Sequence, residues 1–159
     1  MTQEENELLL KDLCERLPYG VKCHFKYGSA EGDVTLGCID NGIARFEYGW
    51  YGKFHVSIDA DYIKPYLRSM SSMTEEEKKN LLVTIVGDDG IKYFQVLSDG
   101  SIDNTDATIQ DLNKFNMHWV SFDKDTVTLY LDWLNAHHFD YRGLIDKGLA
   151  LEALEGMYN

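Results

Sequence analysis

The N-terminal part of the chain changes from a helical to a strand-like pattern of hydrophobic positions. Leucines at helical spacing follow Thr2 and Glu5, a capping-box pair, and Pro18 stops the run, which predicts a helix over 3–17. Strict alternation over 21–27 then predicts a half-buried strand. The same alternation predicts further strands over 34–38, 44–48 and 54–58, with a tight hairpin at Asn41-Gly42.

Residues 59–70 interrupt this alternation. They include Pro65, which cannot donate to a sheet ladder, so we expect a short helical or irregular connection there. The predicted fold class is α+β, with one antiparallel sheet of about three to four strands within 21–58. Helices from the N-terminal and C-terminal parts are expected to cover this sheet.

The second half of the chain is mainly helical in pattern. Thr74 and Glu77 form another capping box, so a helix begins at about 74, and 82–96 is either its end or a hairpin, of which we expect the helix. Asp106 begins a short helix to about 115, and Asp123 or Asp125 begins a longer one reaching 138. Two glycines then allow at most a short helical turn before an extended tail: Gly143 and Gly148.

Composition and charge narrow the function classes. No linker or repeat divides the 159 residues, so we expect one domain over 1–159. The net charge is −12, and residues 71–159 hold 16 acidic against 7 basic side chains. Such a field disfavours direct binding to nucleic acid or to anionic membranes and leaves another protein as the expected partner.

The cysteines and the N-terminus indicate a cytoplasmic protein. Cys14, Cys23 and Cys38 are odd in number and form no C-x-x-C pair, which argues against a disulfide framework or a thiolate zinc site. The first residues are acidic where a secretory signal is basic, and no apolar run reaches membrane-spanning length. No cofactor motif is present, and we expect no cofactor.

Three stretches resemble uncharacterised proteins of gut Bacteroidales genomes, many of them carried by prophages or mobile elements. The C-terminal stretch reads DWLNAHHFDYRGLI over 132–145 and KGLALEA over 147–153. The others cover 8–22 and 64–77, and this chain has Ser69 and Leu154 where the similar proteins tend to have proline. The resemblance implies a cytoplasmic, mobile-element context and no known activity.

The segment 48–54 is the candidate binding site. Aromatic residues between two glycines on a strand connection offer contact area at low entropic cost, although the rings can instead fold back over the sheet. The proposed contact residues are Tyr48, Trp50, Tyr51, Lys53 and Phe54. A small cationic face interrupted by Glu47 can lie beside them, formed by Lys22, His24, Lys26 and Arg45.

Other candidate sites have simpler explanations. His137, His138 and Asp140 are weak metal candidates, because adjacent helical histidines point about 100° apart and no second ligand motif completes a site. We expect Asp140, Tyr141 and Arg142 instead to tie the tail to the body by hydrogen bonds.

Two more patterns fail on their geometry. The loop over 99–110 is similar to a calcium loop but has Asn104 and Gln110 at two key positions. Cys23 and His24 are adjacent on a strand, so their side chains point to opposite faces and cannot form a catalytic pair.

Three function classes follow. The first is a non-enzymatic binding or accessory protein of a prophage or mobile element. The second is an acidic inhibitor that imitates nucleic acid and binds a host nucleic-acid enzyme. The third is a small metal-dependent hydrolase that uses His137, His138 and Asp140.

Overall fold

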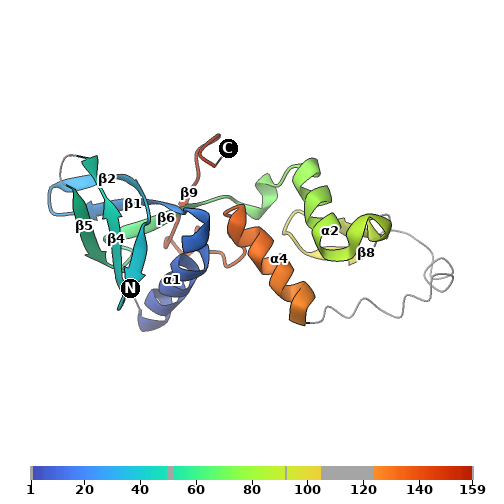
Figure 1. Cartoon of the computed structure of the whole chain (residues 1–159), viewed down its shortest axis with the longest axis horizontal. Coiled ribbons are helices and arrows are strands. Elements are labelled where there is room, and N and C mark those ends of the chain that lie inside the picture. The colour runs from blue at the N-terminus through green and yellow to red at the C-terminus, as the bar shows by residue number, and fades with distance from the viewer. Residues whose placement is uncertain (1, 50–51, 92, 105–123, 159) are drawn as a thin grey trace. The chain divides into compact units, whose positions relative to one another are not determined.

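The computed structural model describes residues 2–49, 52–91, 93–104 and 124–158 (Figure 1). It confirms the α+β class. The chain groups into two compact units. Unit 1 comprises residues 1–69 and 135–159, and unit 2 comprises residues 70–134.

Unit 1 begins with a helix and continues mainly as strands. Its elements are α1 (Gln3–Arg16), the 3-10 turn η1 (Leu17–Tyr19), β1 (Lys22–Tyr27), β2 (Ala30–Thr35), β3 (Cys38–Asp40), β4 (Ile43–Glu47), β5 (Lys53–Ser57), β6 (Ile63–Leu67) and β9 (Leu151–Glu152). The predicted capping box of α1 is present, because the Thr2 hydroxyl accepts from the Glu5 amide and the Glu5 carboxylate accepts from the Thr2 amide. The helix predicted over 3–17 is therefore confirmed.

The prediction of one sheet within 21–58 was wrong, because the strands divide between two sheets. One has the order β2-β1-β6-β9 and the other the order β3-β4-β5. The chain bends between β2 and β3, where the Leu36 amide donates to Val21 of the first sheet and the Gly37 amide donates to Arg45 of the second. A Cβ atom on residue 37 would lie 3.0 Å from the Arg45 carbonyl oxygen, so glycine permits this close approach.

The prediction of an irregular segment over 59–70 was also wrong, because β6 lies there with Pro65 in its middle. Pro65 stands opposite Cys23 of β1. The Lys26 amide donates to Tyr62, and hydrogen-bonded and non-bonded pairs alternate along an antiparallel ladder, so the Cys23–Pro65 pair is a non-bonded one. β1 therefore needs no donor from Pro65, and β9 pairs only with Tyr66 and Leu67.

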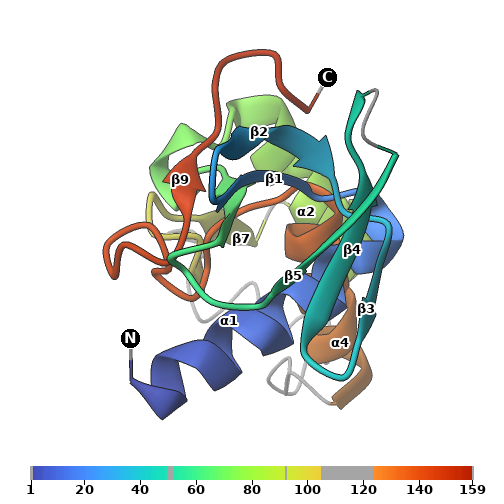
Figure 2. The same ribbon diagram turned by 90° about the vertical axis from the view of Figure 1, so that its left-hand side faces the viewer.

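Both sheets and α1 share one hydrophobic core. Leu9 and Leu13 of α1, Phe25 of β1, Phe46 of β4 and Val56 of β5 are all buried in this core. Figure 2 shows α1 lying alongside the strands of the two sheets. The alternation seen in the sequence thus places most of its apolar members in the interior of unit 1, with Tyr27 and Cys38 as exposed exceptions.

The C-terminal segment, residues 137–158, returns to the first sheet. β9 pairs in parallel with β6, and an isolated bridge joins Arg68 to Phe139. A second buried cluster forms beneath this segment from Leu67, Leu144, Leu149 and Ala150. The predicted extended tail is in part a sheet strand.

Unit 2 contains η3 (Met70–Ser72), α2 (Glu75–Gly90), β7 (Phe94–Val96), β8 (Ile102–Asn104) and most of α4 (Lys124–Ala136). The helix expected over the first part of 82–96 is confirmed, although Gly87 is non-helical with φ 72°. The alternative hairpin of 82–86 with 91–96 does not form, because 82–86 belongs to α2 and β7 pairs with β8. The short helix predicted from Asp106 lies outside the described residues.

Candidate binding surface

The predicted contact segment 48–54 includes two rings that pack against the core. The ring centroids of Tyr48 and Phe54 lie 4.8 and 5.8 Å from that of Phe25. The Tyr48 hydroxyl donates a hydrogen bond of 2.8 Å to the Glu31 carbonyl oxygen. Both rings are thus half-buried and pack against the core, so they are not fully available to contact a partner.

The other three predicted contact residues are placed differently. Lys53 is exposed at the start of β5, whereas Trp50 and Tyr51 lie outside the described residues. The Tyr48 ring lies against Gly32, where a Cβ atom would be only 2.8 Å from the ring. A glycine within a strand is therefore the feature of the sequence that indicates this close approach.

Strand β5 forms one edge of its sheet. Among the described residues, its only sheet neighbour is β4, and Figure 1 shows the two strands side by side in unit 1. The Tyr48 amide donates to Gly52 and the Ile58 amide donates to Gly42, each at 2.9 Å. Because these pairs alternate along the ladder, the backbone groups of Phe54 also point toward β4.

The intervening residues of β5 point their backbone groups outward. These residues are Lys53, His55 and Ser57, and all three are exposed. Among the described residues, none donates a backbone hydrogen bond to Lys53, His55 or Ser57 from outside the sheet, and none accepts one from them. Within the described part of the chain, β5 therefore presents a row of backbone N–H and C=O groups that no other strand pairs with.

Two surface pockets share Lys53, Phe54 and His55 of this strand. The first, about 300 Å³, is lined by Tyr27, Ile43, Lys53, Phe54, His55, Val56 and Ser57. The second, about 430 Å³, is lined by Gly37, Cys38, Arg45, Phe46, Glu47, Lys53, Phe54 and His55. The surface formed by β5 and these two pockets is called the β5 surface below.

The β5 surface includes an exposed aromatic pair at one border. The ring of Tyr27 meets that of Tyr62 edge-on, with centroids 5.8 Å apart. The two side chains are 55% and 41% exposed, so they offer apolar area that the fold itself does not bury.

The predicted cationic face is neutralised by acidic neighbours at most of its positions. His24 contacts the carboxylates of Asp33 and Glu31 at 2.9 and 3.2 Å, and Lys26 contacts Glu31 at 3.4 Å. Arg45 belongs to the other sheet and pairs with Asp40 at 3.0 Å.

The Lys22 ammonium donates instead to the Met157 carbonyl oxygen. The four residues therefore do not form one positive patch.

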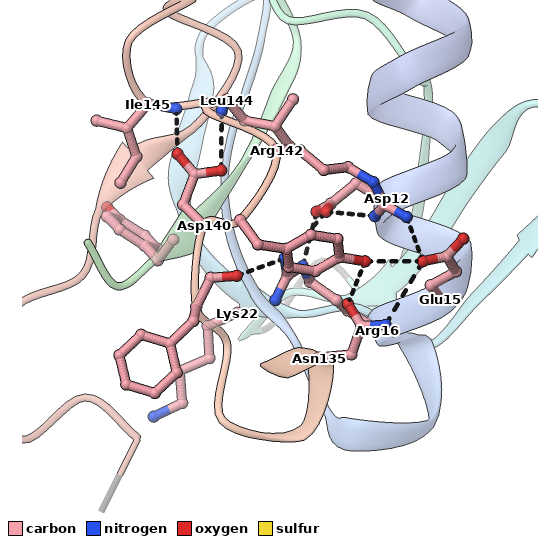
Figure 3. A network of polar contacts seen from close by, with 12 residues as sticks. Asp12, Glu15, Arg16, Lys22, Asn135, Asp140, Arg142, Leu144 and Ile145 are labelled. Atoms are coloured by element: carbon pink, nitrogen blue, oxygen red, sulfur yellow. Dashed lines mark hydrogen bonds and ion pairs between the residues drawn. The ribbon is translucent and has the colours of Figure 1, made fainter. Parts of the chain in front are cut away.

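A buried polar network joins α1 to the C-terminal segment (Figure 3). Asp12 and Arg16 are fully buried and form a two-point ion pair of 2.8 and 3.0 Å. Arg16 also donates to the Phe139 carbonyl oxygen at 2.8 Å, and Arg142 donates to Asp12 at 2.8 Å. A further charge-assisted bond runs from Arg142 to Glu15.

The charges of this network are internally balanced. Two guanidinium groups face two carboxylates, and the Tyr141 hydroxyl lies 3.0 Å from Glu15. Although burial opposes it, the hydrogen bond from Arg142 holds the pKa of Glu15 below its usual value. The prediction that side chains tie the tail to the body is confirmed for Tyr141 and Arg142, whereas the Asp140 carboxylate bonds to amides within the tail. These contacts indicate a structural network.

Two of the three weak metal candidates, Asp140 and His138, have separate structural roles. The Asp140 carboxylate accepts from the amides of Leu144 and Ile145, each at 2.8 Å, and so holds a turn. His138 is buried and stacks on Tyr158 with centroids 3.7 Å apart. Within the described part of the chain, no three His, Cys, Asp or Glu side chains group as metal ligands.

The Tyr158 hydroxyl occupies a place in the first sheet. It accepts from the Lys22 amide at 3.1 Å and donates to the Tyr66 carbonyl oxygen at 2.7 Å. It therefore bridges β1 and β6 just beyond their last ladder pair, Cys23 with Pro65. The C-terminal segment completes the sheet by a side chain as well as by β9.

The remaining candidates are local structure. The Asp99 carboxylate accepts from the amide and hydroxyl of Ser101, which closes the turn between β7 and β8. Cys23 is buried, and burial raises the pKa of its thiol, while His24 lies on the opposite face of β1. No catalytic pair forms between them.

The acidic residues considered for nucleic-acid mimicry include several at helix starts. Glu75, Glu76 and Glu77 occupy the first turn of α2, and Asp125 occupies that of α4. Glu77 completes the capping box with Thr74. Asp106 and Asp123 lie outside the described residues.

None of the helices in the described ranges has the length and apolar character needed to cross a bilayer. The chain matches no protein-family model, no curated protein and no solved structure.

Proposed function

We propose that the protein is a non-enzymatic binding protein that contacts another protein through the β5 surface. The observation that carries this proposal is the combination of a strand edge that no described strand pairs with and two adjoining pockets on that strand. An exposed edge is a liability for a protein that has no use for it, because it invites pairing with other chains. The exposed rings of Tyr27 and Tyr62 add the aromatic area typical of protein interfaces.

The resemblance to mobile-element proteins supports a role as an accessory protein of a prophage or mobile element. The buried network around Asp12 also favours a binding function over catalysis, because its charged groups pair with one another and stabilise unit 1.

Site-specific photo-crosslinking in the native host tests the proposal. A photoreactive residue at position 53 or 55 is expected to give one and the same protein adduct, whereas the exposed position 11 of α1 gives none. Tyr27→Ala is expected to reduce the adduct without unfolding the protein, because the Tyr27 side chain is 55% exposed. Equal adducts at positions 53, 55 and 11, or none at the first two, contradict the proposal.

A further inference from the structure

We propose that residues 154–158 form a latch, which opens and closes on the first sheet while the rest of unit 1 stays folded. The observation behind this inference is the place of the Tyr158 hydroxyl, which stands between the Lys22 amide and the Tyr66 carbonyl oxygen. The inference is independent of the proposed function, because β1 and β6 belong to a different sheet from β5.

The Tyr158 hydroxyl takes the place of a backbone hydrogen bond between β1 and β6. Bonded pairs recur at every second residue of an antiparallel ladder, and Cys23 with Pro65 is a non-bonded pair. The next pair in register, Lys22 with Tyr66, is therefore a bonded one. The hydroxyl accepts from the Lys22 amide at 3.1 Å and donates to the Tyr66 carbonyl oxygen at 2.7 Å. When the hydroxyl leaves, these two backbone groups can bond to each other, so neither loses its partner.

The rest of the latch makes few contacts with unit 1. Just before the latch, the Ala153 amide donates to the Leu67 carbonyl oxygen at 2.7 Å, so the hinge follows Ala153. The Met157 amide bonds within the latch to Leu154, whose side chain is 70% exposed, and the Met157 carbonyl oxygen accepts from the Lys22 ammonium. Neither of the two hydrophobic clusters described for unit 1 includes a latch residue. Opening the latch therefore leaves both clusters intact, and segments with so little buried apolar surface open at low cost.

Opening of the latch uncovers His138. The imidazole is 3% exposed and stacks on the Tyr158 ring, with centroids 3.7 Å apart and planes inclined by 20°. Tyr158 is only partly buried, so it is the outer of the two rings. The Nδ1 atom of His138 has no hydrogen-bond partner among the described residues, and departure of the outer ring lets water reach it. The latch thus controls access to one face of a buried histidine.

Native-state hydrogen exchange of the full chain, measured in increasing urea, tests the latch. The Met157 amide is expected to have a protection factor at least about 100-fold lower than that of the Lys26 amide in β1, because it exchanges whenever the latch opens. Its protection is expected to change little with urea, since opening exposes little surface. The Lys22 amide is expected to stay within about tenfold of the Lys26 protection, because it bonds to Tyr66 while the latch is open.

The variant Tyr158→Phe is expected to shift the latch toward the open state. It keeps the ring but removes the hydroxyl, so a closed latch leaves the Lys22 amide and the Tyr66 carbonyl oxygen without their present partner. Diethyl pyrocarbonate acylates accessible imidazole nitrogens, and mass spectrometry locates the modified residue. His138 is expected to react about tenfold faster in this variant, which is the effect of losing about one hydrogen bond, whereas the exposed His55 reacts at an unchanged rate.

The matched control is Tyr62→Phe, which removes a hydroxyl from a side chain that is 41% exposed and is expected to leave the His138 rate unchanged. Equal protection and equal urea dependence of the Met157 and Lys26 amides would overturn the latch, because residues 154–158 would then leave only on unfolding of unit 1. Loss of Lys22 protection in Tyr158→Phe, or an unchanged His138 rate, would overturn it as well. If circular dichroism shows that the variant does not fold, the exchange of the wild-type amides still decides.

Discussion

Replacement of Asp12 by alanine is expected to lower the free energy of unfolding of unit 1 by about 3–5 kcal/mol. Asp12 accepts bonds from both Arg16 and Arg142, and Arg16 is fully buried. Without that carboxylate, the Arg16 charge stays in the interior with the Phe139 carbonyl oxygen as its one remaining hydrogen-bond acceptor among the described residues, and Arg142 keeps its bond to Glu15. Uncompensated buried charge is among the costliest defects in a folded protein.

Urea unfolding followed by circular dichroism measures this loss, and hydrogen exchange of β1 amides reports on unit 1 separately. The matched control is Asp40→Ala, which removes the same group from the exposed pair with Arg45 and is expected to cost less than about 1 kcal/mol. The double variant Asp12→Leu with Arg16→Met is expected to be more stable than Asp12→Ala, because it leaves no Arg16 charge to bury. Equal costs for Asp12→Ala and Asp40→Ala would contradict a buried, interdependent network.

The parts of the fold that the sequence predicts are those determined by neighbours in the chain. Both capping boxes, Thr2 with Glu5 and Thr74 with Glu77, begin helices where the pattern indicates. The pattern did not predict β6, because a proline fits within a strand only where no neighbouring strand needs its missing N–H group. Whether Pro65 meets this condition depends on its register with β1, which is a long-range property of the fold. The division into two sheets likewise depends on a bend at Gly37 that only the partner strands reveal.

The candidate site was predicted only in part for the same reason. The segment 48–54 includes the beginning of β5, but the sequence does not show that β5 lies at an edge of the described sheet. Alternation indicates which residues face the core and says nothing of the outward backbone groups of His55.

The buried network has a signal in the sequence of α1. Asp12 and Arg16 each follow a buried leucine, Leu9 or Leu13, by three residues, which places them on the inward side of α1. A charged pair on an apolar helical face requires further partners, and here the C-terminal segment supplies Arg142.

The stability of unit 1 is expected to fall by about 2–3 kcal/mol through His138 alone as the pH decreases from 7.5 to 4.5. Burial, and then the charge of Arg16, lowers the pKa of His138 from 6.5 to about 4 in the folded protein. Between these values the unfolded chain binds a proton that the folded chain does not. The contribution is therefore fully present above pH 6.5 and is lost as the pH falls toward 4.

The variant His138→Asn isolates this contribution. His138 has a positive φ of 59°, and asparagine tolerates that left-handed conformation better than most residues while carrying no titratable group. Its absolute stability falls because the stacking on Tyr158 is lost, but the difference between wild type and variant is expected to shrink as the pH decreases. Chemical unfolding at a series of pH values measures that difference.

The exposed histidine of β5 provides the comparison, because His55→Asn removes the same ionisable group from a solvated site. Carboxylates such as Glu15, whose pKa is also lowered, lose their contribution to the free energy of unfolding at lower pH. This loss is the same in wild type and variant. Subtracting the two curves therefore leaves the His138 contribution. Parallel curves for wild type and His138→Asn across this range would show that folding leaves the pKa of the imidazole unchanged, and would remove His138 from the acid sensitivity of unit 1.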